Sequence, residues 1–487
     1  MKKIIILMLA LMIVLCSCSK DEADVKEPDI TTSVVTFGDS DLEIPLSADF
    51  GGEEFYILTS GCGGNCNDFM FEEDSPLALD SAQYKRKMKV ENDYGVKIIE
   101  TELGAGNTSG SGKGFMEISN AVNSGICKYD LALIGGYDVA TLAYNGYLYD
   151  MNSVGGIDLS KSWWDKNATE SLSIDGTTFF TTGEITVSRA DSAFCIMYNK
   201  KLANDYNIPS PYDMVKDGSW TIENFANLCK TITEDVNQDD IMDDNDRYGL
   251  LVLDDSVVGI INAAGGRCAT VNEDGEIELT LYTESNVSAL EKFFDIAFNK
   301  QYALTYQRYG SGRIYEDKLW QEDHGLFWTS YMKMIPRYRS MESDFGILPY
   351  PKFSETQQEY SSTIFPYASQ FICVPLVQND LYRTGIVTEA LAYYGQKIVT
   401  PVYYDVNLVG QSVRDEESVD MLNIILDSLV YDIGYYYQIG PYNKHLIYMI
   451  RENDSNFVTR YESNLPAANA QLDQINEAYK KVTATWK

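Results

Sequence analysis

Hydrophobic and polar positions repeat with two different periods between residues 53 and 150. The segments "EEFYILTSG", "VKIIETEL" and "YDLALIGG" carry short apolar runs that favour strands, the last of them fully buried. The segments "DSAQYKRKMKVENDYG" and "GFMEISNAVNSGI" have helical periodicity, and the first of these helices is expected to stop at Gly95. Strands that alternate with helices of this length predict βα units and a largely parallel sheet.

A second block with the same alternation begins near residue 192. "SAFCIMYNKKLANDYNI" predicts a strand followed by a helix. "GSWTIENFANLCKTIT" predicts a helix with Thr221 as its N-cap and Phe225, Leu228 and Cys229 on one face. Further strands are predicted at "RYGLLVL", "HGLFWTSYM" and "DFGILPYPKF", and further helices at "SNVSALEKFFDIAFNK", "TGIVTEALAYYGQKIV", "ESVDMLNIILDSLVYDIG" and "AANAQLDQINEAYKKVTATW". The chain therefore contains two α/β blocks.

The first residues have the pattern of an export signal. Lys2 and Lys3 precede an apolar run over residues 4–15, which is too short for a typical transmembrane helix. The run ends in Leu-Cys-Ser-Cys, which resembles a bacterial lipobox. Residues 1–17 are then a lipoprotein signal peptide, and Cys18 is the lipidated first residue. Cys16 is a poorer acceptor because Leu15 precedes it, and a plain secretory signal is the alternative. The polar residues 18–45 are expected to form a tether.

The composition excludes several classes of partner. The 487 residues include 72 Asp and Glu against 38 Lys and Arg, a formal net charge of -34. Such a surface repels nucleic acid and anionic membranes, because both require clustered basic side chains. Only two histidines occur, so few residues are available for histidine-based catalysis. The 35 tyrosines suit the binding of polar small molecules.

Seven cysteines follow Cys18, an odd number that cannot all pair within the chain. Cys62 and Cys66 lie close together in a glycine-rich loop and could form a bridge. The other five lie in apolar stretches and are expected to be buried thiols.

The order of these segments resembles a known family. "CIMYNKKLANDYNIPSPYD" followed by "GSWTIENFANLCKTIT" resembles the family 1 extracellular solute-binding proteins, the maltose-binding type of lipoprotein receptor of ABC importers. The segments "AQYKRKMKVENDYGVKI", "YDLALIGGYDVATLAYNGYLYDM", "DFGILPYPKF" and "SQFICVPLVQNDLYRTGIVTEALAYYGQK" fit the same pattern. The resemblance covers nearly all of the chain after the tether.

The resemblance implies an α/β, two-lobed periplasmic-binding-protein fold, a "Venus flytrap" of class II type. Ligand closes the cleft of such a fold by a hinge motion. The chain is expected to cross between the lobes near residues 183–192, 327–332 and 365–374. Lobe one is then 46–185 plus 332–368, and lobe two is 190–327 plus 374–487.

Candidate ligand-binding residues lie in the loops at the strand ends and in the crossings, because ligands of α/β sheets bind beyond the carboxyl ends of the strands. Sugars bind to aromatic faces and to planar polar side chains. The candidates are Ser60, Asn65, Asp68, Tyr137, Asp138, Arg189, Asp191, Trp328, Tyr331, Phe365, Tyr367 and Tyr436. The family's usual sugar-stacking aromatic is missing near "DDSVVGIINAAGG", so Tyr436 or a neighbouring tyrosine is expected to replace it. For Trp328 and Tyr367 the alternative is core packing, and for Arg189 and Asp191 it is an ion pair with each other.

The acidic segment "DVNQDDIMDDND" has the spacing of an EF-hand-type calcium loop. Its oxygen ligands would be Asp235, Asn237, Asp239, Asp243 and Asp246, with the carbonyl of Ile241 at position seven, where the side chain would also anchor the loop in the core. Position six is Asp240 in place of glycine, although aspartate tolerates a left-handed turn better than most residues. A structural Ca²⁺ is expected here, and a solvated acidic loop is the alternative.

The function expected from the resemblance is a monomeric receptor, lipid-anchored on the extracellular face of the cell membrane. It would bind a carbohydrate, with an oligosaccharide as the first expectation, and deliver it to the permease of an ABC importer. No catalytic residue and no nucleic-acid partner is expected. The same fold with a peptide, a polyamine or another polar solute is the nearest alternative. A secreted glycoside hydrolase with paired carboxylates, or a surface glycan adhesin, is the alternative from another class.

Overall fold

The computed structural model describes residues 34–36, 43–45, 48–64, 66–305, 314–377, 380–409 and 415–485. The chain divides into two compact units, residues 1–47 and residues 48–487. In the first unit β1 (Val34–Thr36) pairs antiparallel with β2 (Glu43–Pro45), so the predicted tether contains one short strand pair. The predicted signal peptide and Cys18 lie outside the described residues. Among the helices that are described, none combines the length and the apolar character needed to cross a membrane.

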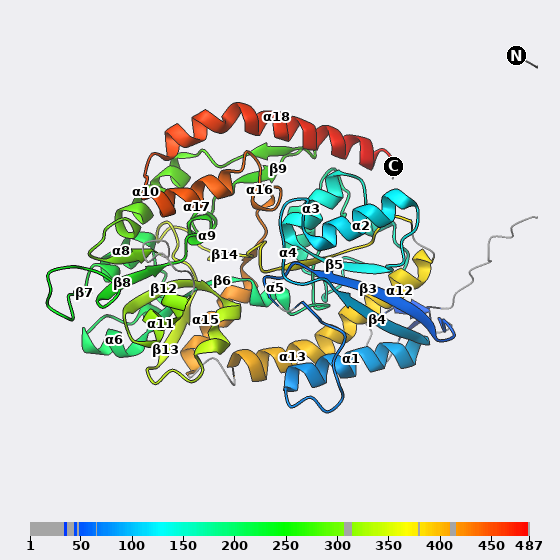
Figure 1. The fold of residues 1–487 in the computed structure, drawn as a ribbon, viewed down its shortest axis with the longest axis horizontal. Helices are drawn as coiled ribbons and strands as arrows, with labels where there is room; N and C mark the ends of the chain where they lie inside the picture. Colours follow the sequence, from blue (N-terminus) through cyan, green and yellow to red (C-terminus); the bar gives the residue numbers. More distant parts are fainter. Residues whose placement is uncertain are drawn as a thin grey trace, which may run out of the picture. The chain divides into compact units, whose positions relative to one another are not determined.

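The second unit contains two main sheets, which Figure 1 shows on opposite sides of the short helix α5 (Ser188–Asp191). The first sheet has the order β15-β5-β3-β4, made of β3 (Glu53–Ser60), β4 (Val96–Glu102), β5 (Leu131–Gly135) and β15 (Gln370–Cys373). β3 runs parallel to β4 and β5, and β15 is antiparallel to β5. The helices α1 (Ala78–Tyr94), α2 (Lys113–Ser124) and α3 (Gly136–Tyr144) alternate with these strands, which confirms the predicted βα units.

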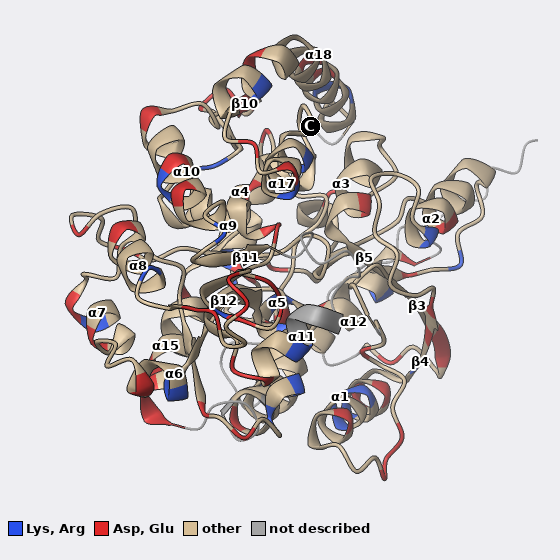
Figure 2. Ribbon diagram, turned by 60° about the vertical axis from the view of Figure 1, so that its left-hand side comes forward, with Lys and Arg blue, Asp and Glu red and all other residues tan. Residues whose placement is uncertain are grey.

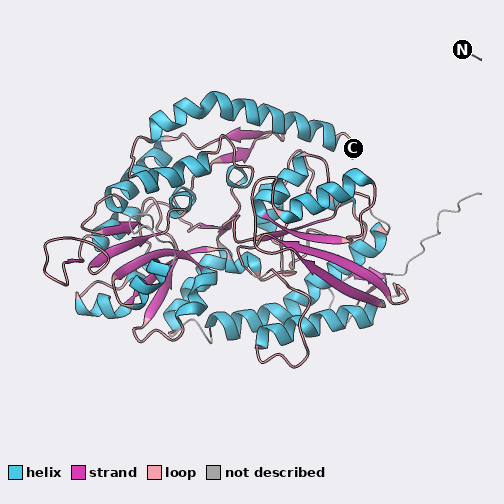
Figure 3. Ribbon diagram, viewed as in Figure 1, coloured by secondary structure: helices cyan, strands magenta, loops and turns pink. Residues whose placement is uncertain are grey.

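The second sheet has the order β11-β8-β12-β6-β13, with β7 paired to β8. Its strands are β6 (Phe194–Asn199), β7 (Thr233–Glu234), β8 (Arg247–Val252), β11 (Ala303–Thr305), β12 (Gly325–Tyr331) and β13 (Phe345–Leu348). Helices surround both sheets (Figure 3). The helix α8 (Ile222–Cys229) begins as predicted, because the Thr221 hydroxyl accepts the Asn224 amide at 3.3 Å, and it buries Phe225, Leu228 and Cys229.

The remaining elements complete the second unit. They are α4 (Lys166–Leu172), α6 (Lys200–Asp205), α7 (Pro211–Asp217), α9 (Ser256–Ala263), β9 (Ala269–Val271), β10 (Ile277–Leu279), α10 (Glu284–Ala297), α11 (Ile314–Gln321), β14 (Ser362–Thr363), α12 (Leu381–Tyr394), α13 (Thr400–Val402), α15 (Glu416–Asp427), β16 (Leu429–Val430), α16 (Ile433–Tyr436), α17 (Tyr442–Glu452) and α18 (Phe457–Thr483), with short 3-10 or π-helical turns at 151–153, 332–338, 395–399 and 403–409. Lys, Arg, Asp and Glu are interspersed along α1 and α10 (Figure 2).

The path of the chain between the sheets differs from the prediction in two places. β13 pairs with β6 in the second sheet, so residues 332–348 do not return through lobe one and no crossing occurs at 327–332. The chain instead returns between β14 and β15, and α12 then packs on α1 beside the first sheet, although residues 374–487 were all assigned to lobe two. Both assignments were wrong because an apolar run predicts a strand but not its partner, which long-range packing decides.

A buried carboxyl group on α12 is expected to make the stability depend on pH. Glu389 accepts the indole N–H groups of Trp163 and Trp164, both at 3.0 Å, and burial raises its pKa to about 8. A folded pKa above the unfolded value near 4.5 means that the stabilisation is complete at low pH and is lost as the pH rises through about 8. Burial also raises the pKa of Glu100 to about 7, which acts in the same direction. The free energy of unfolding should therefore rise between pH 8 and pH 5.

The substitution Glu389→Gln should flatten this pH dependence, because glutamine keeps an acceptor oxygen but does not titrate. One proton corresponds to at most about 1.4 kcal/mol per pH unit. Urea unfolding at pH 5, 6, 7 and 8 measures the slope for the wild type and the variant. An identical slope in both proteins would contradict the role of Glu389.

Candidate functional site

A cavity of about 220 Å³ lies at the ends of strands from both sheets. Tyr137 stands at the start of α3, directly after β5 of the first sheet. The loop of residues 253–255 connects β8 of the second sheet to α9. The remaining lining comes from Phe365 and Tyr367 in the segment that joins the sheets, and from Arg451 on α17. Ligands of α/β sheets bind at such strand ends, so this cavity is the candidate site.

Aromatic rings form much of the wall of the cavity. The ring of Phe365 lies 5.8 Å from that of Tyr367 and 5.5 Å from that of Tyr331, measured between centroids. The ring of Tyr137 meets that of Tyr435 edge-on at 6.0 Å. Each ring is held by another ring, so the wall offers apolar faces in fixed orientations for the C–H face of a flat ligand.

Two neighbouring carboxylates face the same cavity, and each is oriented by a partner. The guanidinium Nε of Arg451 donates to Asp254 at 2.6 Å, and the hydroxyl of Tyr435 donates to Asp255 at 2.9 Å. Burial and the charge of Asp255 both raise the pKa of Tyr137, whose phenol therefore stays protonated and able to donate. The cavity thus combines apolar faces with oriented hydrogen-bonding groups.

A buried asparagine places the first-sheet wall of the cavity against the connecting segment. The amide oxygen of Asn107 accepts the backbone amides of Tyr137 and Asp138 at 3.2 and 3.3 Å. Its amide nitrogen donates to the carbonyl of Pro366 at 2.6 Å. Gly135 is required beside it, because a Cβ at this position would stand 2.3 Å from the carbonyl of Gly61. The Asn107 side chain therefore fixes the start of α3 and the connecting segment at Pro366 relative to each other.

Several solved structures have a similar fold. An ABC substrate-binding protein from Listeria monocytogenes in complex with cycloalternan matches with a TM-score of 0.56 at 14% identity, over 88% of this chain and 99% of that chain. The cyclic α-maltosyl-1,6-maltose binding protein from Arthrobacter globiformis gives 0.57 at 12% identity, over 89% and 99%. The Bdellovibrio bacteriovorus maltose/maltodextrin-binding domain bound to maltotriose gives 0.53 at 14%, over 88% and 99%.

The chain has the fold of the ABC-transporter solute-binding proteins. The predicted α/β binding-protein fold is thereby confirmed, and at these identities the likeness concerns the fold alone. No protein-family model matches the sequence, and no curated protein matches it.

Three of the predicted ligand residues of this solute-binding-protein fold lie in the cavity wall: Tyr137, Phe365 and Tyr367. Tyr331 lies behind Phe365 and is buried. Asn65 lies outside the described residues. Whether these side chains bind a solute stays a prediction.

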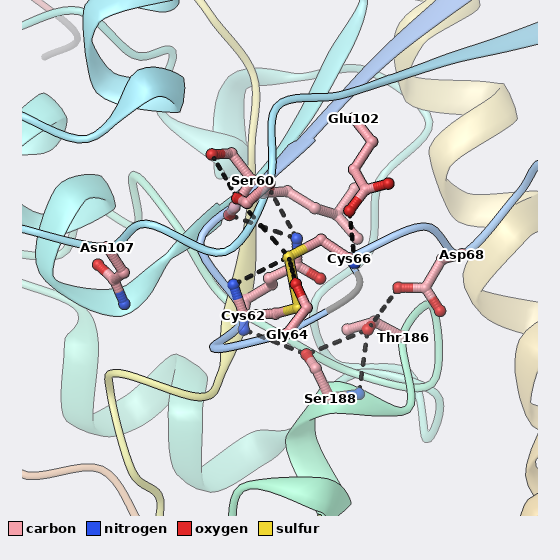
Figure 4. Close-up of a disulfide and its surroundings, with 12 residues drawn as sticks. Ser60, Cys62, Gly64, Cys66, Asp68, Glu102, Asn107, Thr186 and Ser188 are labelled. Atoms are coloured by element: carbon pink, nitrogen blue, oxygen red, sulfur yellow. Dashed lines mark hydrogen bonds between the residues drawn. A yellow bond between two sulfur atoms is a disulfide. The ribbon is translucent and has the colours of Figure 1, made fainter. Parts of the chain in front are cut away.

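Three polar candidates are engaged within or beside the first sheet instead. Asp68 accepts from the side chains of Gln83 and Thr186, both at 2.8 Å, and so fixes the disulfide-closed loop to the first crossing (Figure 4). Ser60 donates to the carbonyl of Gly104 at 3.3 Å. Asp138 is buried, and its carboxylate accepts backbone amides of residues 108–112, with burial raising its pKa to about 6. In this geometry the three side chains hold loops in place.

The disulfide between Cys62 and Cys66, left open by the sequence, is present in the loop after β3 (Figure 4). The ammonium group of Lys333 donates to the carbonyl of Cys62 at 3.1 Å, which ties this loop to the turn after β12. The five cysteines expected to be buried thiols are buried and unbridged, at positions 127, 195, 229, 268 and 373.

The two charged candidates of the first crossing do not pair with each other. Arg189 binds Asp165 at 3.2 Å and Glu184 at 2.7 Å, both from the first-sheet side of the chain. Asp191 accepts the hydroxyl of Tyr403 at 2.6 Å, and burial raises its pKa. The alternative of an Arg189–Asp191 pair is therefore wrong, and both residues hold the crossing in place.

Two aromatic candidates belong to packed cores of the fold. Trp328 is 2% exposed in β12, with its ring 5.8 Å from that of Trp320 and 5.4 Å from that of Tyr338. Tyr436 is 1% exposed and packs edge-on against Phe371 at 5.1 Å. Core packing, the alternative named for Trp328, is what the structure shows.

The substitution Trp328→Phe should separate stability from binding. A smaller ring in a packed core leaves a cavity, so the free energy of unfolding should fall by about 1–3 kcal/mol. The dissociation constant for a bound saccharide should stay unchanged, because the side chain lies outside the cavity wall. Denaturant unfolding and calorimetric titration measure the two quantities, and a large loss of affinity with unchanged stability would contradict this assignment.

The acidic loop of residues 235–246 is folded on its own backbone. The carboxylate of Asp235 accepts the amides of residues 239 and 240 at 3.3 and 2.7 Å, and that of Asp246 accepts the amides of residues 236 and 243 at 2.9 and 2.8 Å. Asp240 adopts the expected left-handed conformation with φ 63°. Ile241 is 61% exposed, so its predicted role as a core anchor was wrong, because the loop projects from the sheet edge.

These carboxylates do not converge on one point in the described arrangement. Within the part of the chain that the structure describes, no group of three or more His, Cys, Asp or Glu side chains is placed to hold a metal ion. The calcium site at Asp235, Asn237, Asp239, Ile241, Asp243 and Asp246 therefore stays a prediction of the sequence.

A calcium titration tests that prediction. If the loop binds Ca²⁺, millimolar calcium raises the melting temperature by mass action, and Asp239→Asn reduces the rise. Asp274→Asn, in an exposed turn, should leave it unchanged. An identical melting temperature with calcium and with a chelator would refute the calcium site.

The residues missed by the sequence reasoning are Leu253, Asp254, Asp255, Arg451 and Asn107. The two aspartates follow the buried strand β8 after one intervening residue, Leu253, and this position at a strand end was the available signal. Arg451 and Asn107 have no such signal. Arg451 lies on the helix α17 and Asn107 lies in the loop before α2, and only the folded packing brings them to the site.

Larger hollows elsewhere are less suited to a flat polar ligand. One of about 540 Å³ is lined by polar and charged side chains, including Lys201, which pairs with Asp205 and Asp323. Another of about 410 Å³ has a single aromatic side chain, Phe353, which is covered by the ammonium of Lys292 at 5.2 Å. The cavity at Tyr137 differs from these two hollows because it joins several aromatic side chains to two carboxylates from the loop after β8.

Proposed function

We propose that this protein is the receptor of an ABC importer and binds a carbohydrate in the cavity at Tyr137. The observation that carries the proposal is the convergence of Tyr137, Phe365 and Tyr367 with two oriented carboxylates at the strand ends of both sheets. Aromatic faces suit the C–H face of a sugar ring, and carboxylate oxygens suit its hydroxyl groups.

The similar structures support the choice of a carbohydrate. They include proteins solved with cycloalternan, with maltotriose and with maltotetraose. In this chain the cavity of about 220 Å³ lies below the range of about 300–1,000 Å³ typical of ligand pockets. An oligosaccharide would therefore place one ring inside this cavity and extend the others beyond it.

Delivery to a permease and anchoring through a lipid on Cys18 belong to the same proposal. Support for the anchor comes from the sequence, where the apolar run of residues 4–15 ends at a lipobox-like Leu-Cys-Ser-Cys. A receptor of this kind holds its solute and performs no reaction on it, and it lies on the extracellular face of the cell membrane.

The test is a thermal-shift panel on a soluble form of the protein that lacks residues 1–18. Neutral mono- and oligosaccharides, amino sugars, peptides and polyamines are added at equal concentration, because a ligand that binds only the native state raises the melting temperature. Shifts confined to saccharides support the proposal. Shifts with peptides or simple polyamines alone, or with none of the compounds, would overturn the carbohydrate assignment.

A further inference from the structure

The aromatic wall of the cavity is in contact with the loop that the disulfide closes. We define the disulfide loop as residues 61–64 together with Cys66, in the segment that follows β3. A Cβ built on Gly63 would stand 3.3 Å from the ring atom Cε1 of Tyr367 and 3.4 Å from the Tyr367 carbonyl oxygen. The backbone of Gly63 therefore lies directly against a ring that lines the cavity.

The disulfide restricts a segment that would otherwise have great backbone freedom. Cys62 and Cys66 enclose Gly63 and Gly64, and glycine loses more conformational freedom on folding than any other residue. Gly63 has a φ of 65°, in the left-handed region that favours glycine. Both half-cystines are buried, and the Cys66 amide donates to the carboxylate of Glu102 at 3.0 Å (Figure 4). The bond between the two sulfurs therefore limits the positions that Gly63 can take beside the aromatic wall.

A lysine from the second-sheet side of the chain holds the same loop. Lys333, in the turn after β12, donates from its ammonium group to the carbonyl of Cys62 at 3.1 Å. A Cβ built on Gly64 would stand 3.0 Å from the same nitrogen. Cys62 and Gly64 flank Gly63 in the sequence, so Lys333 contacts the loop on each side of the residue that contacts Tyr367.

We propose that the disulfide loop is a positioning element of the solute site. Closed by its disulfide and held by Lys333, the loop fixes the ring of Tyr367 in the orientation in which that ring stacks on the solute. Fixing a binding group in advance raises affinity, because less side-chain freedom is lost when the solute binds. The proposal rests on the carbohydrate-binding function above, and it adds residues outside the cavity wall to those that set the affinity.

Alanine substitutions at two glycines test the contact with Tyr367. Gly63→Ala places a methyl group 3.3 Å from the ring and should weaken saccharide binding about tenfold, measured by calorimetric titration of the soluble form that lacks residues 1–18. Gly51→Ala is the matched control, because Gly51 has the same φ of 65° and a Cβ there meets no atom within 4 Å. Backbone strain should lower the melting temperature of both variants, whereas only Gly63→Ala should lose affinity.

Removal of the disulfide tests the covalent closure of the loop. The double variant Cys62→Ser with Cys66→Ser should weaken saccharide binding about tenfold in the wild-type background. When Tyr367 is already alanine, the same two changes should weaken binding less than about twofold, because residues that act through one contact are not additive. A general loss of stability would instead reduce the affinity equally in both backgrounds. Thermal unfolding before each titration shows whether the variant is folded.

Two lysine variants test the contact from the second-sheet side. Lys333→Met removes the donor to the Cys62 carbonyl and should weaken saccharide binding about threefold to tenfold. Lys318→Met makes the same change of charge on α11, where the side chain is 63% exposed and pairs with Glu322 at 3.6 Å, and it should leave the affinity unchanged. Equal affinities of the two lysine variants would overturn the role of Lys333.

The outcomes separate this inference from the function on which it rests. Wild-type affinity in Gly63→Ala and in the cysteine variant overturns the positioning role and leaves the carbohydrate receptor intact. An equal loss of affinity with and without the Tyr367 ring also overturns it, since the loop would then act through another contact. If the cysteine variant does not fold, the comparison of Gly63→Ala with Gly51→Ala decides alone. Absence of saccharide binding by the wild type overturns both proposals.

Discussion

The substitution Arg86→Met is expected to lower the free energy of unfolding by about 3–5 kcal/mol, the cost of removing one partner from a buried charged group. Arg86 is fully buried on α1, and its guanidinium donates to the carbonyls of Asp68 and Ile185, both at 2.6 Å. It also lies 4.5 Å from the ring centre of Phe69. Burial lowers its pKa to about 10, which still leaves the side chain charged at neutral pH.

Methionine fills a similar volume but leaves two buried carbonyls without donors and the carboxylates of Asp68 and Glu100 without a nearby positive charge. Ile185 belongs to the first crossing, so the variant should also loosen the link between the sheets. Urea unfolding measures the loss.

The matched control is Lys85→Met on the same helix, where the side chain is exposed and the change should stay within about 0.5 kcal/mol. Equal stability of Arg86→Met and the control would show that the buried guanidinium does not hold this region together.

The substitution Tyr367→Ala is expected to weaken saccharide binding by about tenfold to a hundredfold. Its ring lines the cavity and stands 5.8 Å from that of Phe365, so the change removes a stacking face from the ligand. Truncation of an aromatic contact at a binding site commonly costs about 1.4–2.8 kcal/mol. Because Tyr367 is only half-buried, the fold should be retained.

Tyr282→Ala is the control for this change. Tyr282 is 48% exposed, and its ring stacks on that of Tyr461 at 4.9 Å, outside the cavity wall. Calorimetric titration of the best saccharide should show unchanged affinity for this variant. Affinity that survives in Tyr367→Ala but falls in Tyr282→Ala would place the binding site elsewhere.

Local pattern was sufficient to predict most elements and the α/β class, whereas the two-lobed binding-protein fold was predicted from the family resemblance. The stop of α1 at Gly95 and the Thr221 cap of α8 are local features, since each depends on backbone groups within a few residues. Residues close in sequence do not determine which sheet β13 joins. Its partner β6 is about 150 residues away, and the apolar run of β13 would suit either sheet. Predictions of pairing therefore failed where predictions of elements did not.

For the candidate site, too, residues at local features were predicted, whereas contacts between distant segments were not. Tyr137 was accessible to prediction because it follows a buried strand, and Phe365 and Tyr367 because the resemblance placed a crossing there. Asp138 has the right chemistry and position, but its carboxylate is used by the amides of the loop before α2. Arg451 could not be found, since only the folded packing of α17 brings it to Asp254.

Hydrogen exchange with and without a saturating saccharide tests the central claim most directly. One sugar ring held in the cavity should protect backbone amides in segments from both sheets at once, around Tyr137, residues 253–255, residues 365–367 and Arg451. Protection confined to one sheet, or centred on the hollow at Lys201, would contradict the claim that the solute binds between them.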